Sequence, residues 1–211
     1  MAVKKAGIIV ILSSPSGAGK TTLVKKISSR NNYKVSISHT TRKPRSNEKN
    51  GRDYYFVNKT EFKRLIKNKQ FLEYAKVFKN YYGSLRETVI NKLNKCENII
   101  FDIDWQGTRQ IKNKKLKYKI ITIFILPPSK EELFKRLLKR EKKDVKIANE
   151  RMKQFKNDVM YWKDYDFTVI NDKVENCYRS IIKFINLQKK QKSSVNYNRK
   201  FIKNHIKNLI N

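Results

Sequence analysis

Residues 8–22, with the sequence IIVILSSPSGAGKTT, decide the fold class of this chain. An apolar run of mostly β-branched residues passes directly into a loop of small residues, and a pattern typical of a helix follows. This order of strand, glycine loop and helix is the context in which a phosphate-binding loop forms. Gly17 and Gly19 allow backbone N–H groups to converge on phosphate oxygens without interference from Cβ atoms. The following helix directs the positive end of its dipole to the same anion.

The two residues that follow Gly19 suit a nucleoside triphosphate. Lys20 is placed to bridge the terminal phosphates, and Thr21 to offer its hydroxyl to Mg²⁺. Ser14 stands where the loop pattern has its first glycine, and serine is small enough for the turn. The alternative is a glycine-rich turn that binds no ligand. The expected triphosphate loop comprises Ser14, Pro15, Ser16, Gly17, Ala18, Gly19, Lys20, Thr21 and Thr22.

The length of 211 residues suits one domain with an insert, or two small domains, and is sufficient to bury a core. No apolar run approaches the length that spans a membrane, and residues 1–7 lack the features of a signal peptide. The two cysteines, Cys96 and Cys177, form no CxxC pair, and only two histidines are present, so we expect no zinc site. A reduced, cytoplasmic setting fits this cysteine usage.

The formal net charge of +32 raises the alternative of a nucleic-acid-binding protein. The lysines are scattered along the chain instead of gathered on one element, which is typical of a solvated surface. A basic field also suits an enzyme with polyanionic substrates, because it raises their encounter rate. We therefore expect no nucleic-acid partner. The sequence is compatible with a homo-oligomer and specifies none.

Apolar strands that alternate with helical patterns predict an α/β fold with a parallel sheet. Residues 38–88 interrupt the alternation with signals of hairpins, so we interpret them as an inserted mixed α/β subdomain. Within it, Thr60 is the expected N-cap of a helix and residues 81–84 an expected turn. Strands are expected at residues 8–12, 35–38, 53–57, 71–78, 98–104, 120–126 and 167–171. Helices are expected at about 20–29, 60–69, 85–93, from 129, at 144–162 and at 174–187.

The character of the chain changes near residue 188. Residues 188–211 are polar and basic at first, and apolar residues then recur at near-helical spacing from Phe201 to Ile210. We expect a frayed basic tail or a terminal helix on the surface. The alternative is an arm that binds RNA or a membrane surface.

Several polar residues outside the loop suit anion chemistry. Arg42 and Arg45 follow a strand, and with Tyr54, Tyr82 and Ser84 they would form a second phosphate site. Asp102 and Asp104 end a buried strand, where parallel sheets hold ligands and where a carboxylate commonly orders Mg²⁺ through water. The alternative is that both aspartates only cap the strand end.

Three arginines follow the Pro127-Pro128 pair. Arg136 and Arg140 lie four residues apart, on one face of a helix, and Arg151 comes from the next helical segment. Together they would neutralise charge during phosphoryl transfer. The alternative is a solvated basic helix face.

A series of motifs in one order resembles the guanylate kinase family, closest to its bacterial form, over residues 7–187. These motifs are Ser38-x-x-Thr41-Arg42-x-Pro44-Arg45, Gly51-x-Asp53-Tyr54-x-Phe56-Val57, Phe71-Leu72-Glu73, Asn80-Tyr81-Tyr82-Gly83-Ser84, Asp102-Ile103-Asp104-x-Gln106-Gly107, Ile125-x-Pro127-Pro128-Ser129 and Val169-Ile170-Asn171-Asp172.

The resemblance implies transfer of the γ-phosphoryl group of ATP to GMP, with Mg²⁺, on a P-loop NTPase-type core. It implies a core at residues 1–37 and 89–187, a GMP-binding insert at 38–88 and a helical lid at about 129–155. Asn171 matches a position near the adenine of ATP. The implied GMP-binding residues are Ser38, Arg42, Arg45, Tyr54, Glu73, Tyr82, Ser84, Asp102 and Asp104. The implied catalytic residues are Lys20, Arg42, Arg136, Arg140 and Arg151.

Two departures from the family pattern stand out besides Ser14. The lid has Lys139-Arg140-Glu141 where the family usually has Gly-Arg-Gly, and the tail beyond residue 187 lies outside the resemblance. One competing hypothesis is a guanylate-kinase-like interaction domain, but such domains typically have an eroded phosphate loop. Another is a kinase of a different small acceptor, against which Glu73 and Ser38 argue.

Overall fold

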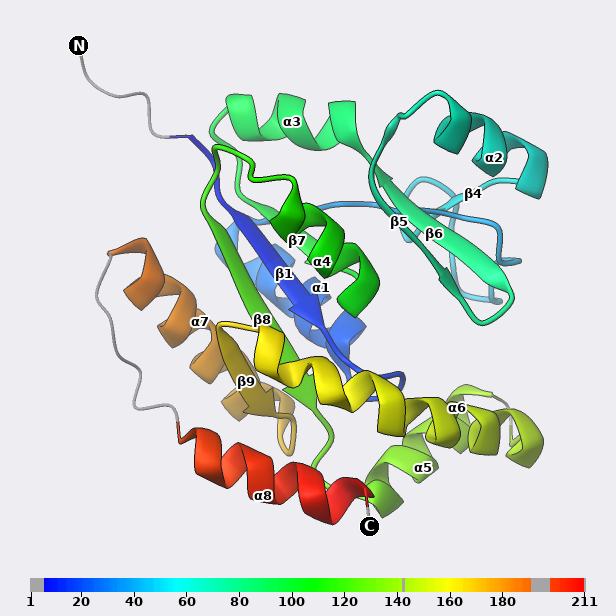
Figure 1. Ribbon diagram of the computed structural model, residues 1–211, viewed down its shortest axis with the longest axis vertical. Coiled ribbons are helices and arrows are strands. Elements are labelled where there is room, and N and C mark those ends of the chain that lie inside the picture. The colour runs from blue at the N-terminus through cyan, green and yellow to red at the C-terminus, as the bar shows by residue number, and fades with distance from the viewer. Residues whose placement is uncertain (1–5, 142, 191–197, 211) are drawn as a thin grey trace. The chain divides into compact units, whose positions relative to one another are not determined.

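The computed structural model describes residues 6–141, 143–190 and 198–210. The chain divides into two compact units. Unit 1 comprises Met1–Ile11 and Asn32–Ile120, and unit 2 comprises Leu12–Asn31 and Ile121–Asn211. The boundary passes through strand β1, Ile9–Ser13 (Figure 1).

The predicted parallel sheet is confirmed. Five strands have the order β2-β7-β1-β8-β9, and the pairs β2–β7 and β8–β9 are parallel. All five residues of β1 are buried, as a continuous apolar run in a covered parallel sheet requires. The other four strands are β2 (Lys34–Val35), β7 (Ile99–Asp102), β8 (Ile120–Leu126) and β9 (Phe167–Ile170).

Unit 1 also contains a second sheet of four strands, in the order β4-β3-β6-β5. Pairs β3–β6 and β5–β6 are antiparallel, and β3–β4 is parallel. Phe62 of the first helix in this unit stacks on Phe71 and Tyr81 of the sheet, with ring centroids 4.6 and 5.4 Å apart. The elements are β3 (His39–Thr40), β4 (Tyr55–Phe56), α2 (Lys59–Lys67), β5 (Phe71–Val77), β6 (Asn80–Leu85), α3 (Arg86–Asn94) and α4 (Trp105–Asn113).

Unit 2 supplies the remaining helices. They are α1 (Lys20–Asn31), α5 (Lys130–Arg140), α6 (Val145–Asp158), the 3₁₀ helix η1 (Val159–Asp164), α7 (Val174–Lys189) and α8 (Arg199–Ile210). Helix α7 packs against α1 and β9. The Glu175 carboxylate of α7 pairs with the Lys26 ammonium of α1 at 2.6 Å, which ties the two helices together at the surface.

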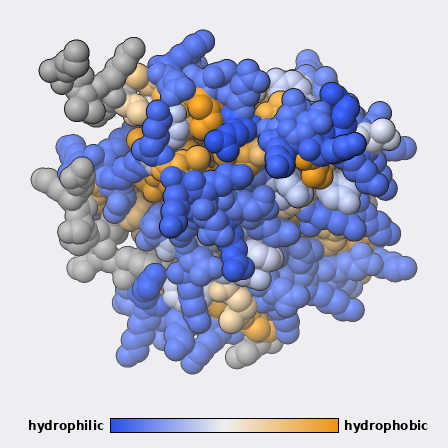
Figure 2. Space-filling view, turned by 45° about the horizontal axis from the view of Figure 1, so that its top comes forward, coloured by the Kyte–Doolittle hydropathy of each residue, from blue (hydrophilic) through white to orange (hydrophobic). Residues whose placement is uncertain are grey.

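Each unit has its own buried core. In unit 1, Ile9, Leu72, Leu93 and Phe101 belong to one cluster, and all four are fully buried. In unit 2, a second cluster joins Phe124 of β8 to residues of α5, α6, η1 and α8. The surface seen in Figure 2 is mostly hydrophilic, with small hydrophobic areas, which agrees with the expected solvated distribution of the lysines.

Several predicted boundaries are wrong in detail. Residues 81–84 are not a turn but part of β6, and the β5–β6 hairpin turns instead at Phe78, which has φ of +54°. The strand expected at 35–38 ends at Val35, and the one expected at 53–57 is limited to Tyr55–Phe56. The helix expected to continue to residue 162 becomes a 3₁₀ helix at Val159.

The tail contains the amphipathic helix α8, whose apolar side is not at the surface. Ile202, Ile206 and Leu209 are buried in the unit 2 core, whereas Phe201 is exposed, so the tail contains a terminal helix at the surface, as expected, with one side packed into the core. Residues 191–197, which precede it, lie outside the described residues. No helix in the described ranges has the length and apolar character needed to cross a membrane.

The N-cap of α2 is Asn58 and not the predicted Thr60. The Asn58 side chain accepts a hydrogen bond from the Glu61 N–H at 2.8 Å, and Thr60 lies inside the first turn. Side-chain oxygens at the N-cap satisfy N–H groups that have no partner within the helix.

Asn58→Ala is expected to lower the free energy of unfolding by about 1 kcal/mol, because it removes this cap. The control Thr60→Ala removes no cap and is expected to change it by less than about 0.5 kcal/mol. Denaturant titration of both variants measures the difference. Equal losses, or a larger loss for Thr60→Ala, would contradict the observed cap.

Candidate functional site

The phosphate loop has the conformation that its glycines predict. Gly17 and Gly19 have φ of +88° and +97°, a region that side chains with a Cβ rarely adopt. The loop follows the end of β1, and α1 begins at Lys20. Backbone N–H groups at the first turn of a helix have no partner within the helix, so this end of α1 is suited to an anion.

The side chain of Asn171, the residue after β9, contacts the backbone of the phosphate loop. Its side-chain amide donates to the Ala18 carbonyl at 2.8 Å, and Asn171 is 1% exposed. A Cβ atom on Gly19 would lie 2.2 Å from the Asn171 Nδ2 atom. The sequence predicts Asn171 as an adenine neighbour, and the structure gives it a contact with the loop backbone, which no motif indicated.

Helix α5 packs against the other glycine of the loop. A Cβ on Gly17 would lie 2.9 Å from Leu133 and 3.0 Å from Leu137, both fully buried residues of α5. Helix α5 begins at the N-cap Ser129, whose hydroxyl accepts a hydrogen bond from the Glu132 N–H at 3.1 Å. The absence of two Cβ atoms therefore lets both β9 and α5 approach the loop.

The three predicted arginines of unit 2 differ in their contacts. The Arg136 guanidinium donates to the Asn171 carbonyl at 3.4 Å and to the Glu132 carboxylate at 2.8 Å. The Arg151 guanidinium donates to the Ser16 hydroxyl, in the phosphate loop, at 2.9 Å. Two of the three are thus joined directly to the loop or to the residue that supports it.

Arg140 is the most exposed of these arginines, and it reaches the loop only through other residues. Its Nε lies 3.5 Å from the Glu141 carboxylate, which also lies 3.0 Å from the Arg151 Nε. In the sequence, Glu141 stands out only as the residue in place of a lid glycine, and nothing there indicates this pairing. The pairing of Glu132 with Arg136 does have a signal, because the two lie four residues apart on a helix.

Three predicted GMP-binding residues meet in the second sheet of unit 1. Ser38 and Ser84 are buried, with their hydroxyl oxygens 3.3 Å apart. Glu73 of β5 pairs with Ser84 of β6 in the strand register and is 2% exposed. A carboxylate and two hydroxyls therefore form a buried polar group, with Glu73 and Ser84 on neighbouring strands and Ser38 directly before β3.

Helix α4 approaches this group closely at Gly107. A Cβ on Gly107 would lie 2.4 Å from the Glu73 Oε2 atom. Gly107 belongs to one of the family motifs, but its role is not evident from the sequence, because a glycine within a helix does not indicate which residue lies opposite it.

A second set of predicted residues gathers around Tyr54. The Arg42 guanidinium lies over the Tyr54 ring, 5.4 Å from its centroid, and the Tyr54 and Tyr82 rings meet edge to face at 6.0 Å. Burial, followed by the Asp102 charge, raises the pKa of the Tyr54 hydroxyl, which is thus neutral near pH 7. This set offers cationic and hydroxyl donors together, as the predicted phosphate site requires.

Glu48 joins the two arginines of this set and was not predicted. Its carboxylate accepts hydrogen bonds from the Arg42 guanidinium at 2.9 Å and from the Arg45 N–H at 2.8 Å. The Arg45 guanidinium lies 3.6 Å away. Burial favours the neutral carboxyl, but the hydrogen bonds from Arg45 and Arg42 outweigh it and lower the pKa of Glu48. Its distance of three residues from Arg45 was the only signal in the sequence.

The two aspartates after β7 have different surroundings. Asp102 ends the strand, and its charge acts on Tyr54. Asp104 is the N-cap of α4, and its carboxylate accepts hydrogen bonds from the Gln106 and Gly107 N–H groups at 3.0 and 3.1 Å. The structure thus gives Asp104 a capping function, while its contact with GMP stays a prediction.

The candidate site consists of two half-sites, each within one unit: a phosphate loop in unit 2 and a buried polar group beside cationic donors in unit 1. A family model described as guanylate kinase matches residues 7–188. The chain belongs to the guanylate kinase family.

Curated relatives and a solved structure agree with this membership. The chain is 46% identical over 172 residues to a guanylate kinase of Blochmanniella floridana, covering 80% of this chain and 81% of the relative. It is 45% identical over 186 residues to one of Rickettsia prowazekii, covering 88% and 93%. A crystal structure of guanylate kinase from Anaplasma phagocytophilum has a TM-score of 0.72 and 32% identity, covering 88% of each chain. The chain is therefore a nucleoside monophosphate kinase, an ATP:GMP phosphotransferase.

Glu48→Gln is expected to lower the free energy of unfolding at pH 7 by about 1–2 kcal/mol, because it removes a charged acceptor of two hydrogen bonds in a partly exposed site. The control is Glu61→Gln, whose carboxylate pairs with Arg64 on the exposed side of α2, and its effect is expected to be much smaller. Denaturant titration measures both.

The pH dependence gives a second test of the same ion pair. A carboxyl whose pKa is lowered by folding stabilises the protein above its unfolded pKa, about 4.3, and loses this contribution as the pH falls through the folded pKa. The difference between wild type and Glu48→Gln is therefore expected to shrink below about pH 4. A difference that stays constant with pH would contradict the pairing.

Proposed function

We propose that this chain, in transferring the γ-phosphoryl group of ATP to GMP, binds ATP on the phosphate loop and GMP on the second sheet of unit 1. One observation carries the assignment of GMP. Ser84 and Tyr82 are two residues apart on β6, so they share one face of the sheet at a spacing of roughly 7 Å. The buried polar group that contains Ser84 thus suits the base of one nucleotide. The set of Arg42, Arg45, Tyr54 and Tyr82 suits its phosphate.

Glu73 supplies the preference for guanine in this proposal. Guanine offers N1–H and an exocyclic amine as adjacent donors, and a single carboxylate accepts from both. Adenine lacks this pair of donors, so the buried Glu73 carboxylate would lose its hydrogen bonds against AMP, which is costly in a buried site. Ser38 and Ser84 add hydroxyls that donate or accept at the same base.

Arg42, Arg45, Tyr54 and Tyr82 hold the GMP phosphate in the same proposal. The Arg42 guanidinium is fixed by Glu48 and by the Lys43 carbonyl at 2.7 Å, so its orientation is set before the ligand arrives. A guanidinium held in this way loses less freedom on binding phosphate than a flexible side chain does.

The phosphate loop holds the triphosphate of ATP through its N–H groups and Lys20. The chemistry of the residues present also fits Mg²⁺: Thr21, an exposed residue in the first turn of α1, carries a hydroxyl, and ATP itself supplies phosphate oxygens. Among the described residues, no group of three or more His, Cys, Asp or Glu side chains forms a separate metal site. When bound, the ion would neutralise phosphate charge, and Asp102 as its partner through water stays a prediction.

The mechanism needs no general base, because the acceptor is already a phosphate oxyanion. Phosphoryl transfer depends on in-line positioning of the two phosphates and on neutralisation of the charge that develops. Lys20 acts on the terminal phosphate in this proposal, and Arg136, Arg140 and Arg151 supply further positive charge on residues 129–155, the proposed lid. In this proposal, residues 38–88 form the insert that binds GMP. The reaction takes place in the cytoplasm.

The decisive experiment is a coupled assay of ADP release with ATP, Mg²⁺ and each of GMP, AMP, CMP and UMP. We expect strong turnover with GMP alone. Glu73→Gln is expected to lower kcat/KM for GMP by about a hundredfold or more, since it removes the acceptor that reads guanine. Lys20→Ala is expected to lower kcat by about 10²–10³-fold, in the range found for a preorganised group that stabilises developing charge.

Glu61→Gln is the matched control, because Glu61 is a surface carboxylate on α2 that pairs with Arg64. Its kinetics are expected to match the wild type. No turnover with any acceptor by a folded protein would refute the kinase assignment and favour a binding module. Equal turnover with AMP and GMP would refute the role of Glu73.

A further inference from the structure

Helix α8 lies beyond the part of the chain that matches the family model, which ends at residue 188. Ile202, Ile206 and Leu209 on one side of it are only 5%, 4% and 2% exposed. Phe201, on the same helix, is 58% exposed. The helix is thus amphipathic, and its apolar side is buried within unit 2.

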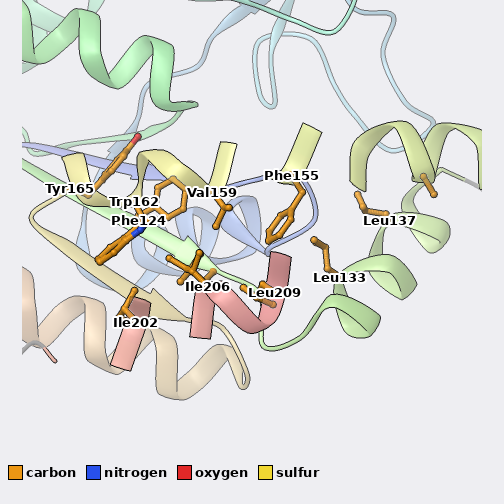
Figure 3. Close-up of a cluster of buried hydrophobic side chains, with 12 residues drawn as sticks. Phe124, Leu133, Leu137, Phe155, Val159, Trp162, Tyr165, Ile202, Ile206 and Leu209 are labelled. Atoms are coloured by element: carbon orange, nitrogen blue, oxygen red, sulfur yellow. The ribbon is translucent and has the colours of Figure 1, made fainter. Parts of the chain in front are cut away.

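The buried side of α8 shares one hydrophobic cluster with α5. Ile206 and Leu209 belong to the same cluster as Leu133 and Leu137, and Figure 3 shows their side chains directed into it. The two leucines of α5 are also the residues that a Cβ on Gly17 would meet, at 2.9 and 3.0 Å. Packing is therefore continuous from α8 through α5 to the phosphate loop.

A polar contact joins α8 to the start of α5. The His205 Nε2 lies 2.9 Å from the Pro127 carbonyl oxygen, and because a carbonyl only accepts, the imidazole N–H donates. Pro127 lies two residues before Ser129, the N-cap of α5. Helix α8 thus shares a hydrophobic cluster with Leu133 and Leu137 of α5 and is hydrogen-bonded to the chain that leads into α5.

We propose that α8 positions α5 against the phosphate loop, which makes Ile206, Leu209 and His205 positioning residues for the donor nucleotide. Helix α5 carries Arg136, whose guanidinium reaches the Asn171 carbonyl beside the loop. Protein cores are close-packed, so a cavity under α5 loosens the side chains above it. This inference rests on the proposed binding of ATP at the loop.

The kinetic test compares Leu209→Ala with Phe201→Ala, a control on the exposed side of the same helix. Leu209→Ala is expected to raise KM for ATP by about tenfold, within the range that ångström-scale misplacement of positioning groups produces. KM for GMP is expected to stay within about twofold of the wild type, because the proposed GMP half-site belongs to unit 1 and α8 to unit 2. A uniform loss of folded protein would instead lower kcat and leave both KM values unchanged. A parallel rise of both KM values, no rise for ATP, or the same rise in Phe201→Ala would overturn the proposal.

A second measurement needs no activity. Amide hydrogen exchange without nucleotide is expected to be faster in residues 14–22 and 130–140 of Leu209→Ala than of Phe201→Ala, since local opening reports local stability. If exchange in Leu209→Ala is faster elsewhere in the chain but not in these two segments, the proposal is overturned. His205→Ala, which removes one hydrogen bond and leaves the cluster intact, provides the same comparison if Leu209→Ala does not fold. If the two variants show this difference in exchange while the wild type shows no ATP turnover, the proposed function is refuted and this inference is not.

Discussion

The close approach of supporting side chains to the phosphate loop is the constraint on which unit 2 depends. The Asn171 amide occupies the space that a Cβ on Gly19 would need, and Leu133 and Leu137 occupy the space beside Gly17. The conformation of the loop therefore depends on the residues that pack against it from α5 and from the end of β9. The hydrogen bond from Asn171 to the Ala18 carbonyl joins the end of β9 to the loop. The cost of the positive φ angles is borne by glycines, where it is smallest. The N–H groups of the loop and of the first turn of α1 are thus suited to an anion.

Unit 1 holds a carboxylate and two arginines whose chemistry suits the proposed ligand, a nucleotide with a base and a phosphate group. Glu73 lies in a buried site, where a lost hydrogen bond is costly and discrimination between bases is strong. Arg42 and Arg45 lie in an irregular segment, and Glu48 holds them together. In the proposed function, the cations attract the phosphate and the carboxylate selects the base. The net charge of +32 suits polyanionic substrates, because a basic field raises their encounter rate.

Much of this was predictable because the signals are local. The strand, loop and helix of residues 8–31 follow from apolar runs and glycine spacing, and parallel pairing follows from continuous buried strands. The residues Ser38, Glu73 and Ser84 were predicted from motifs, and the structure brings them together. Predictions failed where two choices had similar local propensity, as for Asn58 and Thr60, both good caps. The turn expected at residues 81–84 failed because Gly83 occurs inside a strand, where Phe71 leaves no room for a Cβ.

The remaining features depend on contacts between distant segments, which no spacing reveals. Helical periodicity in residues 201–210 indicates a helix but not that its apolar side joins one hydrophobic cluster with β8, α5, α6 and η1. The role of Asn171 at the loop is of the same kind, because 153 residues separate it from Ala18. The contact between Gly107 and Glu73 is another example.

The central claim is that two nucleotides bind at two separately built half-sites, one in each unit. Calorimetric titration with GMP, alone and after saturation with Mg²⁺ and a nonhydrolysable ATP analogue, tests it most directly. The account predicts one GMP per chain in both titrations, with the analogue failing to displace it. Competition between GMP and the analogue for a single site would contradict the account.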